Sequence, residues 1–224
     1  MKTITTLLFT FFTLASIAQR TIDREVGEFN EIKVFDLIEV NMIQSDENKI
    51  LIKGRNVDDI KWANKDGVLK LRMQLDKKFT GEDTFIEVYY TNVDIIDGNE
   101  GAQITCNEMM SKNKIELKAQ EGAKITIGMD VAVAEIRAVT GGIIEASGLA
   151  ENQTIVLNTG GVFEGRDLRS SISDVKISAG GEAEVFASER IDVNVKAGGD
   201  VTVYGQPKKV NKKTFVGGRV RMMD

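Results

Sequence analysis

The residues best placed to do chemistry form a row of three carboxylates, Glu145, Glu164 and Glu184. Each stands four residues after a Gly in a repeated phrase. If the repeats stack as parallel strands, neighbouring carboxylates lie about 4.8 Å apart along one face. That spacing resembles the roughly 5 Å separation of the two carboxyl groups of a retaining glycosidase. The row has three interpretations: a solvated face, which any stacked helix produces, a Ca²⁺ site, or a catalytic pair. We favour the solvated face.

Other kinds of catalytic and metal site are restricted by the residue types present. The chain has no His and a single Cys, Cys106. The lack of His excludes Ser-His triads, Cys-His dyads and His-based metal sites. Cys106 falls in an apolar row, so we expect a small buried side chain rather than a reactive thiol. We expect no cofactor and no catalytic residues.

A second group of candidate residues combines one cation with two aromatic rings. Arg166, Phe186 and Tyr204 each stand six residues after the repeated Gly, in three consecutive copies. An Arg beside exposed rings could bind a sugar or a peptide. The alternative is that these side chains pack under a C-terminal cap, and we favour the cap.

These candidates all depend on a short Gly-containing motif that recurs six times between residues 93 and 205. Its first glycines are Gly101, Gly122, Gly141, Gly160, Gly180 and Gly198, in steps of 21, 19, 19, 20 and 18 residues. Five residues before them stand the apolar Ile96, Leu117, Ile136, Ile155, Val175 and Val193. Alternating apolar and polar residues on both sides of each Gly predict two short strands per copy, with one buried face. The constant period predicts coils that stack in parallel.

The six glycines are expected at tight corners, where the backbone needs a positive φ. The hexapeptide pattern of left-handed β-helices is missing. The sequence therefore predicts an all-β fold: a right-handed parallel β-helix-like solenoid of about six coils, with a less regular β-rich N-terminal part.

The ends of the chain differ from the repeats. Residues 1–18 combine Lys2, an apolar run and the small residues Ser16 and Ala18, which is typical of a secretory signal peptide. The run is too short to span a membrane. Residues 19–92 are expected to form the β-rich part and residues 93–224 the coils, with 214–220 as a final strand or cap. No linker separates them, so 19–224 should form one continuous domain.

The composition bounds the location and the partners. The 224 residues carry a net charge of −5, and we find no basic cluster, which argues against nucleic-acid binding. The signal peptide predicts export, to the periplasm, the outer-membrane surface or the medium. After its cleavage we expect no transmembrane segment.

Several segments, in this order, resemble one known family. They are residues 20–32, Leu37-Ile38-Glu39-Val40, Lys49 to Gly54, Gly67 to Leu71 and the Gly-Ala and Gly-Gly coils. Together they are similar to the head GIN domain family, exported bacterial proteins frequent among Bacteroidetes. The resemblance implies an auto-transporter adhesin with a pectin-lyase-like β-helix. Where the family has its namesake Gly-Ile-Asn, this chain has Leu37-Ile38-Glu39.

The function expected from these patterns is non-catalytic binding or adhesion. A rigid β-helical face would present rows of polar side chains to a glycan or to another component of the cell envelope. One alternative is a carbohydrate-active enzyme, a polysaccharide lyase or hydrolase, on a β-helix frame. Another is a structural scaffold of the envelope.

Overall fold

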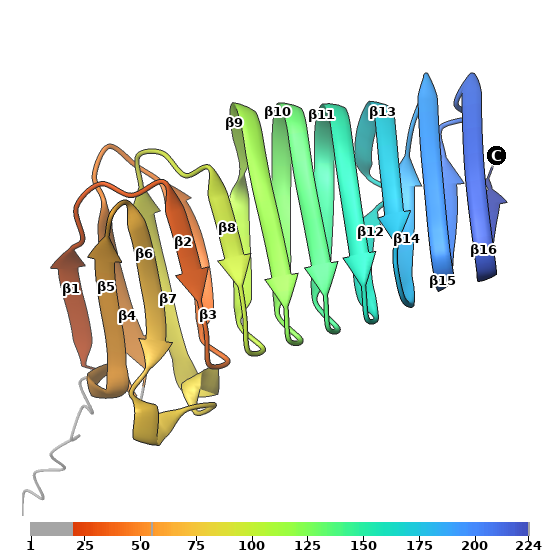
Figure 1. Cartoon of the computed structure of the whole chain (residues 1–224). Coiled ribbons are helices and arrows are strands. Elements are labelled where there is room, and N and C mark those ends of the chain that lie inside the picture. Colours follow the sequence, from red (N-terminus) through yellow and green to blue (C-terminus); the bar gives the residue numbers. More distant parts are fainter. Residues whose placement is uncertain (1–19, 55, 224) are drawn as a thin grey trace, which may run out of the picture.

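The computed structural model describes residues 20–54 and 56–223, so the signal peptide predicted for residues 1–18 lies outside the described part. Strands account for most of this part, and its helices are three short 3₁₀ turns. Figure 1 shows the strands as an elongated stack, with β1 and β16 at opposite ends.

The elements fall into an N-terminal group and a repeat group. The N-terminal group is β1 (Thr21–Glu25), β2 (Glu31–Val34), β3 (Glu39–Gln44), β4 (Lys49–Gly54), η1 (Val57–Asp59), β5 (Ile60–Lys65), β6 (Val68–Met73), η2 (Leu75–Lys77), η3 (Gly81–Asp83) and β7 (Thr84–Tyr90). The repeat group is β8 (Ile95–Gly98), β9 (Gln103–Gln120), β10 (Lys124–Val139), β11 (Ile143–Asn158), β12 (Gly161–Gly165), β13 (Leu168–Ile177), β14 (Gly181–Phe186), β15 (Arg190–Tyr204) and β16 (Lys209–Met222).

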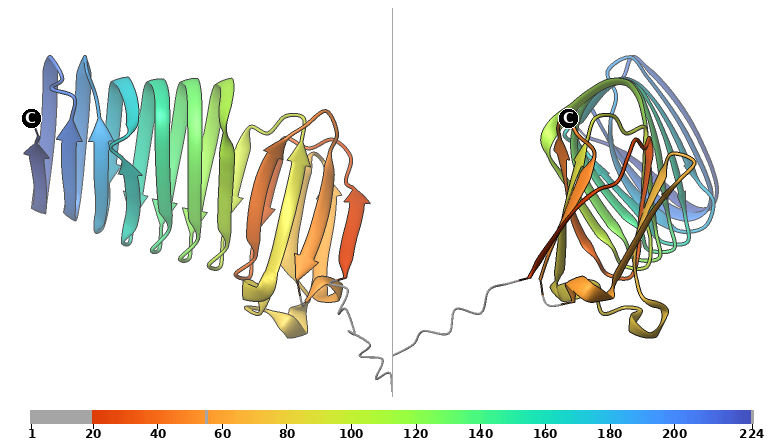
Figure 2. Two further views of the ribbon diagram at one scale, coloured as in Figure 1. Left: turned by 180° about the vertical axis from the view of Figure 1, so that it is seen from behind. Right: turned by 90° about the vertical axis from the view of Figure 1, so that its left-hand side faces the viewer.

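Successive repeats pair in parallel and in register. Position for position, β10 pairs with β11, so Ile136 faces Ile155; Ile155 in turn pairs with Val175, and Val175 with Val193. These four side chains are at most 3% exposed. Seen along the stack in Figure 2, the rungs overlie one another. The predicted all-β parallel solenoid is confirmed.

The corners between the two strands of each rung are joined by their own ladder of hydrogen bonds. The N–H of Gly122 donates to the carbonyl of Thr140, and the N–H of Gly141 to that of Thr159. The six predicted corner glycines all have positive φ, between 59° and 77°. In the first four of these corners the preceding residue also has positive φ, as in a type I′ turn.

The second Gly of a corner serves a different purpose. A Cβ added at Gly161 would lie 2.0 Å from the carbonyl oxygen of Ala138 in the neighbouring rung, whereas one added at Gly160 would meet nothing within 4 Å. The first Gly therefore supplies the backbone conformation, and the second lets adjacent rungs approach.

The N-terminal part contributes two further rungs, but not in sequence order. β2 and β3 pair in parallel with β8 and β9. β6 and β7 then pair with β2 and β3 on the outer side. The antiparallel strands β4 and β5 flank this outer rung, and β1 pairs with β4 at the end of the stack. The less regular N-terminal part is thus confirmed, and a single 16-stranded sheet connects it to the repeats.

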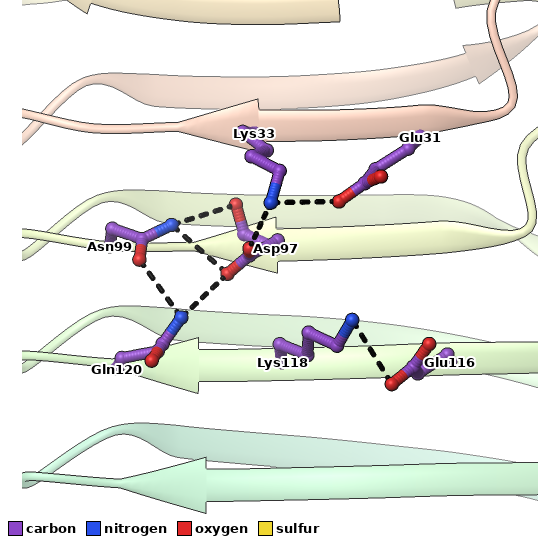
Figure 3. Close-up of polar contacts among 7 residues, drawn as sticks. All are labelled: Glu31, Lys33, Asp97, Asn99, Glu116, Lys118 and Gln120. Carbon is purple, nitrogen blue, oxygen red and sulfur yellow. Dashed lines mark hydrogen bonds and ion pairs between the residues drawn. The ribbon is translucent and has the colours of Figure 1, made fainter. Parts of the chain in front are cut away.

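A buried polar network joins the two parts (Figure 3). Asp97 on β8 is 3% exposed. Its carboxylate accepts hydrogen bonds from Lys33 on β2 at 3.2 Å, from Asn99 at 3.0 Å and from Gln120 on β9 at 3.1 Å. The side chain of Glu31, and then Asp97, raise the pKa of Lys33 above its ordinary value. Three consecutive rungs are therefore tied through one buried carboxylate.

A further corner lies at Asp36 and Leu37, which both have positive φ although neither is Gly. The N–H of Leu37 donates to the carbonyl of Glu100, so this corner begins the same ladder. Asp36 is fully buried, and its Oδ1 and the Oε2 of Glu100 have no hydrogen-bonding donor among the described residues. Burial, and then the charge of Asp36, raise the pKa of the Glu100 carboxyl.

The last strand, β16, pairs with β15 along its length and repeats the corner pattern, with Gly217 at φ 66°. The sequence predicts a final strand or a cap for residues 214–220, and in the structure these residues belong to the strand β16. Nearly all of its side chains are exposed.

We predict different costs for Ala at the two corner glycines. Gly161→Ala should lower the free energy of unfolding by about 3 kcal/mol, because its methyl group overlaps a backbone carbonyl. Gly160→Ala should cost about 1 kcal/mol, since it meets only the strain of positive φ. Urea denaturation of both variants measures the difference, and equal losses would contradict the separate roles.

We also predict that Glu100→Gln stabilises the protein at neutral pH. A raised carboxyl pKa in the folded state means that ionisation opposes folding. This penalty is absent below the unfolded pKa and grows as the pH rises through the folded pKa. The melting temperature of the variant should therefore exceed that of the wild type at pH 7 and converge with it near pH 4. The exposed control Glu28→Gln should show no such trend; a gain for Glu100→Gln that is the same at both pH values would refute the explanation.

Candidate functional site

One face of the solenoid carries a groove of about 640 Å³, lined by residues of β9, β10, β11, β12 and β14 and by the turn after β12. We call it the acidic groove. Its lining contains six carboxylates and one cation: Glu108, Glu145, Glu164, Asp167, Glu182, Glu184 and Arg166. The groove therefore has a strongly negative local charge.

The floor of the acidic groove contains the predicted glutamate row. Glu145 pairs with Glu164, and Glu164 with Glu184, as Cα partners of adjacent parallel strands. Threonines continue the row on both sides, Thr126 next to Glu145 and Thr202 next to Glu184. The strand spacing of about 4.8 Å therefore separates the three glutamates along the stack.

The three glutamates differ in their partners. Glu145 forms an ion pair with Lys124 at 3.0 Å and accepts a 3.5 Å hydrogen bond from Thr126. Glu184 accepts a hydrogen bond from the hydroxyl of Tyr204 at 3.4 Å. Within the described part of the chain, the exposed Glu164 has neither an ion pair nor a side-chain hydrogen bond. It is the carboxylate of the row that is most available to a ligand.

The glutamates are not gathered into a cation site. Across residues 20–54 and 56–223, no three His, Cys, Asp or Glu side chains converge as metal ligands would. Calcium binding by the row stays the less favoured alternative to a solvated face.

One wall of the acidic groove is a bulge in β9. Cys106 pairs with Ile127, and Met110 with Met129, so three residues on β9 oppose the single Gly128 on β10. These residues, 107–109, project from the face, and Met109 is 55% exposed. A bulge adds residues without disrupting the flanking register. The 21-residue step in the sequence is its only signal.

The opposite wall is the turn after β12, where Arg166 and Asp167 separate β12 from β13. The N–H of Gly148 donates to the carbonyl of Asp167 at 3.0 Å, which fixes the turn to the neighbouring rung. This turn lies within the 20-residue step between the corner glycines Gly160 and Gly180. The two walls, on β9 and after β12, are three strand spacings or about 14 Å apart, and the lining continues past the second wall to β14.

The predicted aromatic group lies beside this wall and is split into two cation–π pairs. The guanidinium of Arg166 is 4.8 Å from the ring centre of Tyr204, and that of Arg169 is 5.5 Å from that of Phe186. All four line a smaller adjoining hollow of about 420 Å³. Both rings are half-buried, and a guanidinium lies over each ring. The sequence missed Arg169 because it lies outside the repeated phrase.

Cys106 is buried at the base of the β9 bulge, and burial raises the pKa of its thiol to about 12. A thiol with this pKa remains protonated at neutral pH, so Cys106 provides no nucleophile for the groove.

A separate hollow of about 760 Å³ contains Lys112, Asp130, Glu151 and Arg169. Its cations and anions balance. It therefore lacks the single-sign charge that sets the acidic groove apart.

The acidic groove is suited to ligands that carry hydrogen-bond donors rather than to anionic ligands. Carboxylates accept hydrogen bonds from hydroxyl and ammonium groups, and a ring covered by a guanidinium offers an edge for apolar contact. One cation among six carboxylates is a poor site for an anionic substrate. Sequence reasoning missed four of the lining residues, Glu108, Met109, Asp167 and Glu182. The first two lie in the bulge, Asp167 lies in the turn, and Glu182 on β14 pairs with Val162 rather than with a member of the glutamate row.

No helix in the described residues has the length and apolar character needed to cross a membrane.

Solved structures of bacterial proteins share the fold over nearly the whole chain. A "putative adhesin" from Bacteroides fragilis NCTC 9343 matches with a TM-score of 0.85 and 19% identity, over 93% of this chain and 98% of that one. A "putative adhesin" from Parabacteroides merdae ATCC 43184 has a TM-score of 0.73 and 16% identity, over 92% and 96%. A "putative lipid binding protein" from Parabacteroides distasonis ATCC 8503 has a TM-score of 0.71 and 15% identity, over 92% and 97%.

No curated protein matches the sequence. Residues 28–207 match the family described as "Putative auto-transporter adhesin, head GIN domain". The match runs from the start of the N-terminal rungs through the last complete corner before β16. The chain therefore belongs to the head GIN domain family.

Proposed function

We propose that this protein is an exported, non-catalytic binding protein whose acidic groove holds a neutral or amine-bearing glycan. The observation that supports this most is the composition of the groove, six carboxylates and a single cation around about 640 Å³. Family membership supports adhesion in general terms. The predicted signal peptide supports export to the periplasm, the outer-membrane surface or the medium.

The exposed floor favours a ligand rich in hydrogen-bond donors. Glu164 is flanked on both sides by other glutamates, and like charges on adjacent strands repel. A ligand hydroxyl or ammonium group would satisfy its acceptor capacity and reduce that repulsion. Binding should thus stabilise the row.

The length and edges of the groove suit a short saccharide. About 14 Å between the walls is enough for roughly three sugar units, estimated from strand spacing. The ring of Tyr204, with Arg166 above it, lies at one end and could contact the apolar face of a sugar. The thioether of Met109 provides a flexible contact at the other end.

The groove is less suited to the two alternative ligand classes. A polysaccharide lyase acting on a uronic acid needs cations to neutralise the substrate carboxylate, and the lining offers only Arg166. A lipid chain needs an enclosed apolar site, whereas this floor is a row of Thr and Glu side chains.

We predict that Glu164→Gln combined with Glu184→Gln weakens glycan binding by about tenfold or more, because charged hydrogen-bond acceptors are replaced by neutral amides. The purified protein would be screened on an array of neutral, amine-bearing and uronic-acid glycans, with affinities from calorimetry. Chitosan oligosaccharides are the amine-bearing probe and polygalacturonate fragments the anionic one.

The matched control is Glu25→Gln with Glu28→Gln, which removes the same charge from exposed positions on β1 and in the loop that follows it. Figure 1 shows β1 at the far end of the stack. It should bind like the wild type. Preference for polygalacturonate, or equal losses in both double variants, would refute the groove as the site. Release of cleaved product from a bound glycan, abolished by the groove variant, would favour the enzyme instead.

The calcium interpretation of the row is tested separately. We expect millimolar calcium to leave the melting temperature unchanged, because the three glutamates do not converge with other acidic ligands. A calcium-dependent rise in melting temperature that disappears in Glu164→Gln would establish a cation site and overturn this expectation.

A further inference from the structure

The C-terminal end of the stack is an open sheet edge. Within the described residues, β16 pairs with β15 and with no other strand. The backbone N–H and C=O groups along its far edge therefore have no strand partner. This edge lies at the opposite end of the molecule from β1 (Figure 1).

The edge carries a concentrated positive charge. Residues 205–223 contain six cations and no Asp or Glu, although the whole chain has a net charge of −5. The cations are Lys208, Lys209, Lys212, Lys213, Arg219 and Arg221. The expectation that the chain has no basic cluster was wrong, because these six cations lie close together both in the sequence and along the terminal rung.

Several of these cations are available to a partner. Arg219 and Lys208 form ion pairs with Asp200 and Glu189. In contrast, Lys209, Lys212 and Lys213 form no ion pair with any described residue.

Lys212 occupies a position that is apolar in the preceding rung. It pairs with Val193, which is 3% exposed and belongs to the inner row. A Lys on the inner side of an edge strand discourages indiscriminate strand pairing. A strand that docks against β16 must therefore provide a carboxylate for it.

The contact between β15 and β16 shows the chemistry that joins strands here. The carboxylate of Asp200 on β15 accepts two hydrogen bonds from Arg219 on β16, at 2.5 and 2.7 Å. Asp192 accepts one from Asn211 at 2.6 Å. Acidic side chains of one strand thus face donors of the next.

We infer that β16 binds an extended acidic segment of another protein, which adds to the sheet as a further strand and presents carboxylates on both of its faces, to Lys209 and Lys213 on the outer face and to Lys212 on the inner face. Such strand addition takes its affinity from main-chain hydrogen bonds and its specificity from alternate side chains. A second β16 would place cations against cations. An anionic lipid surface would leave the backbone groups of the edge unpaired.

This inference does not depend on the acidic groove, and a peptide probe tests it directly. The probe is a blocked peptide of about 12 residues with the repeat Glu-Glu-Val-Thr, which places carboxylates on both faces of a strand and is long enough to span Lys209 to Lys213. Its charge-reversed counterpart has Lys in place of Glu. Fluorescence anisotropy with the whole protein should show saturable micromolar binding of the acidic peptide, weakened by salt, and none of the Lys peptide.

The triple variant Lys209→Glu, Lys212→Glu and Lys213→Glu should weaken this binding by at least about tenfold. The matched control changes Lys61, Lys65 and Lys70 to Glu, on and beside the other edge strand β5, and should bind like the wild type. The contrast between the two peptides on the wild-type protein does not depend on either variant folding.

Three results would overturn the inference. They are equal affinity for both peptides, equal losses in the two triple variants, and saturable binding of phosphatidylglycerol vesicles without binding of the acidic peptide. A concentration-dependent oligomer that excludes the peptide would assign the edge to a second copy of the chain, and would also count against it.

Discussion

The apolar side chains of each rung are shielded from water by the rungs directly above and below it. Because the pairing is parallel and in register, the inner positions stack on inner positions and the outer positions on outer ones. The register that buries Ile155 between Ile136 and Val175 also aligns Glu145, Glu164 and Glu184 outside. The exposed acidic row is thus a direct consequence of the packing that holds the fold together.

The places where the period changes give the face its shape. Two extra residues in β9 become the bulge at 107–109, and one extra residue after β12 accompanies the turn at Arg166 and Asp167. Between these projections the regular rungs form the floor of the acidic groove. The repeats therefore provide a rigid scaffold, and the insertions decide where a ligand can be enclosed. At the C-terminal end, the described residues supply no strand beyond β16, and cations lie along this edge.

The regular coils could be predicted from the sequence because glycine and the apolar rows recur at a fixed period. The N-terminal rungs could not, since a local pattern does not reveal that β6 and β7 lie outside β2 and β3. The corner at Asp36 and Leu37 was missed because positive φ is recognised in a sequence mainly through Gly. For the site, the glutamate row followed from the repeat, whereas the walls and the pairing of Arg169 with Phe186 depend on tertiary contacts.

Amide hydrogen exchange over the whole chain tests most directly whether stacked rungs hold the structure together. The account predicts the slowest exchange in β10 and β11, which have rungs on both sides, and progressively faster exchange toward the end strands β1 and β16. Exchange in β10 and β11 as fast as in the loop that contains η2 and η3 would contradict it. In that case the rungs would not protect one another, and the acidic row would have no fixed spacing.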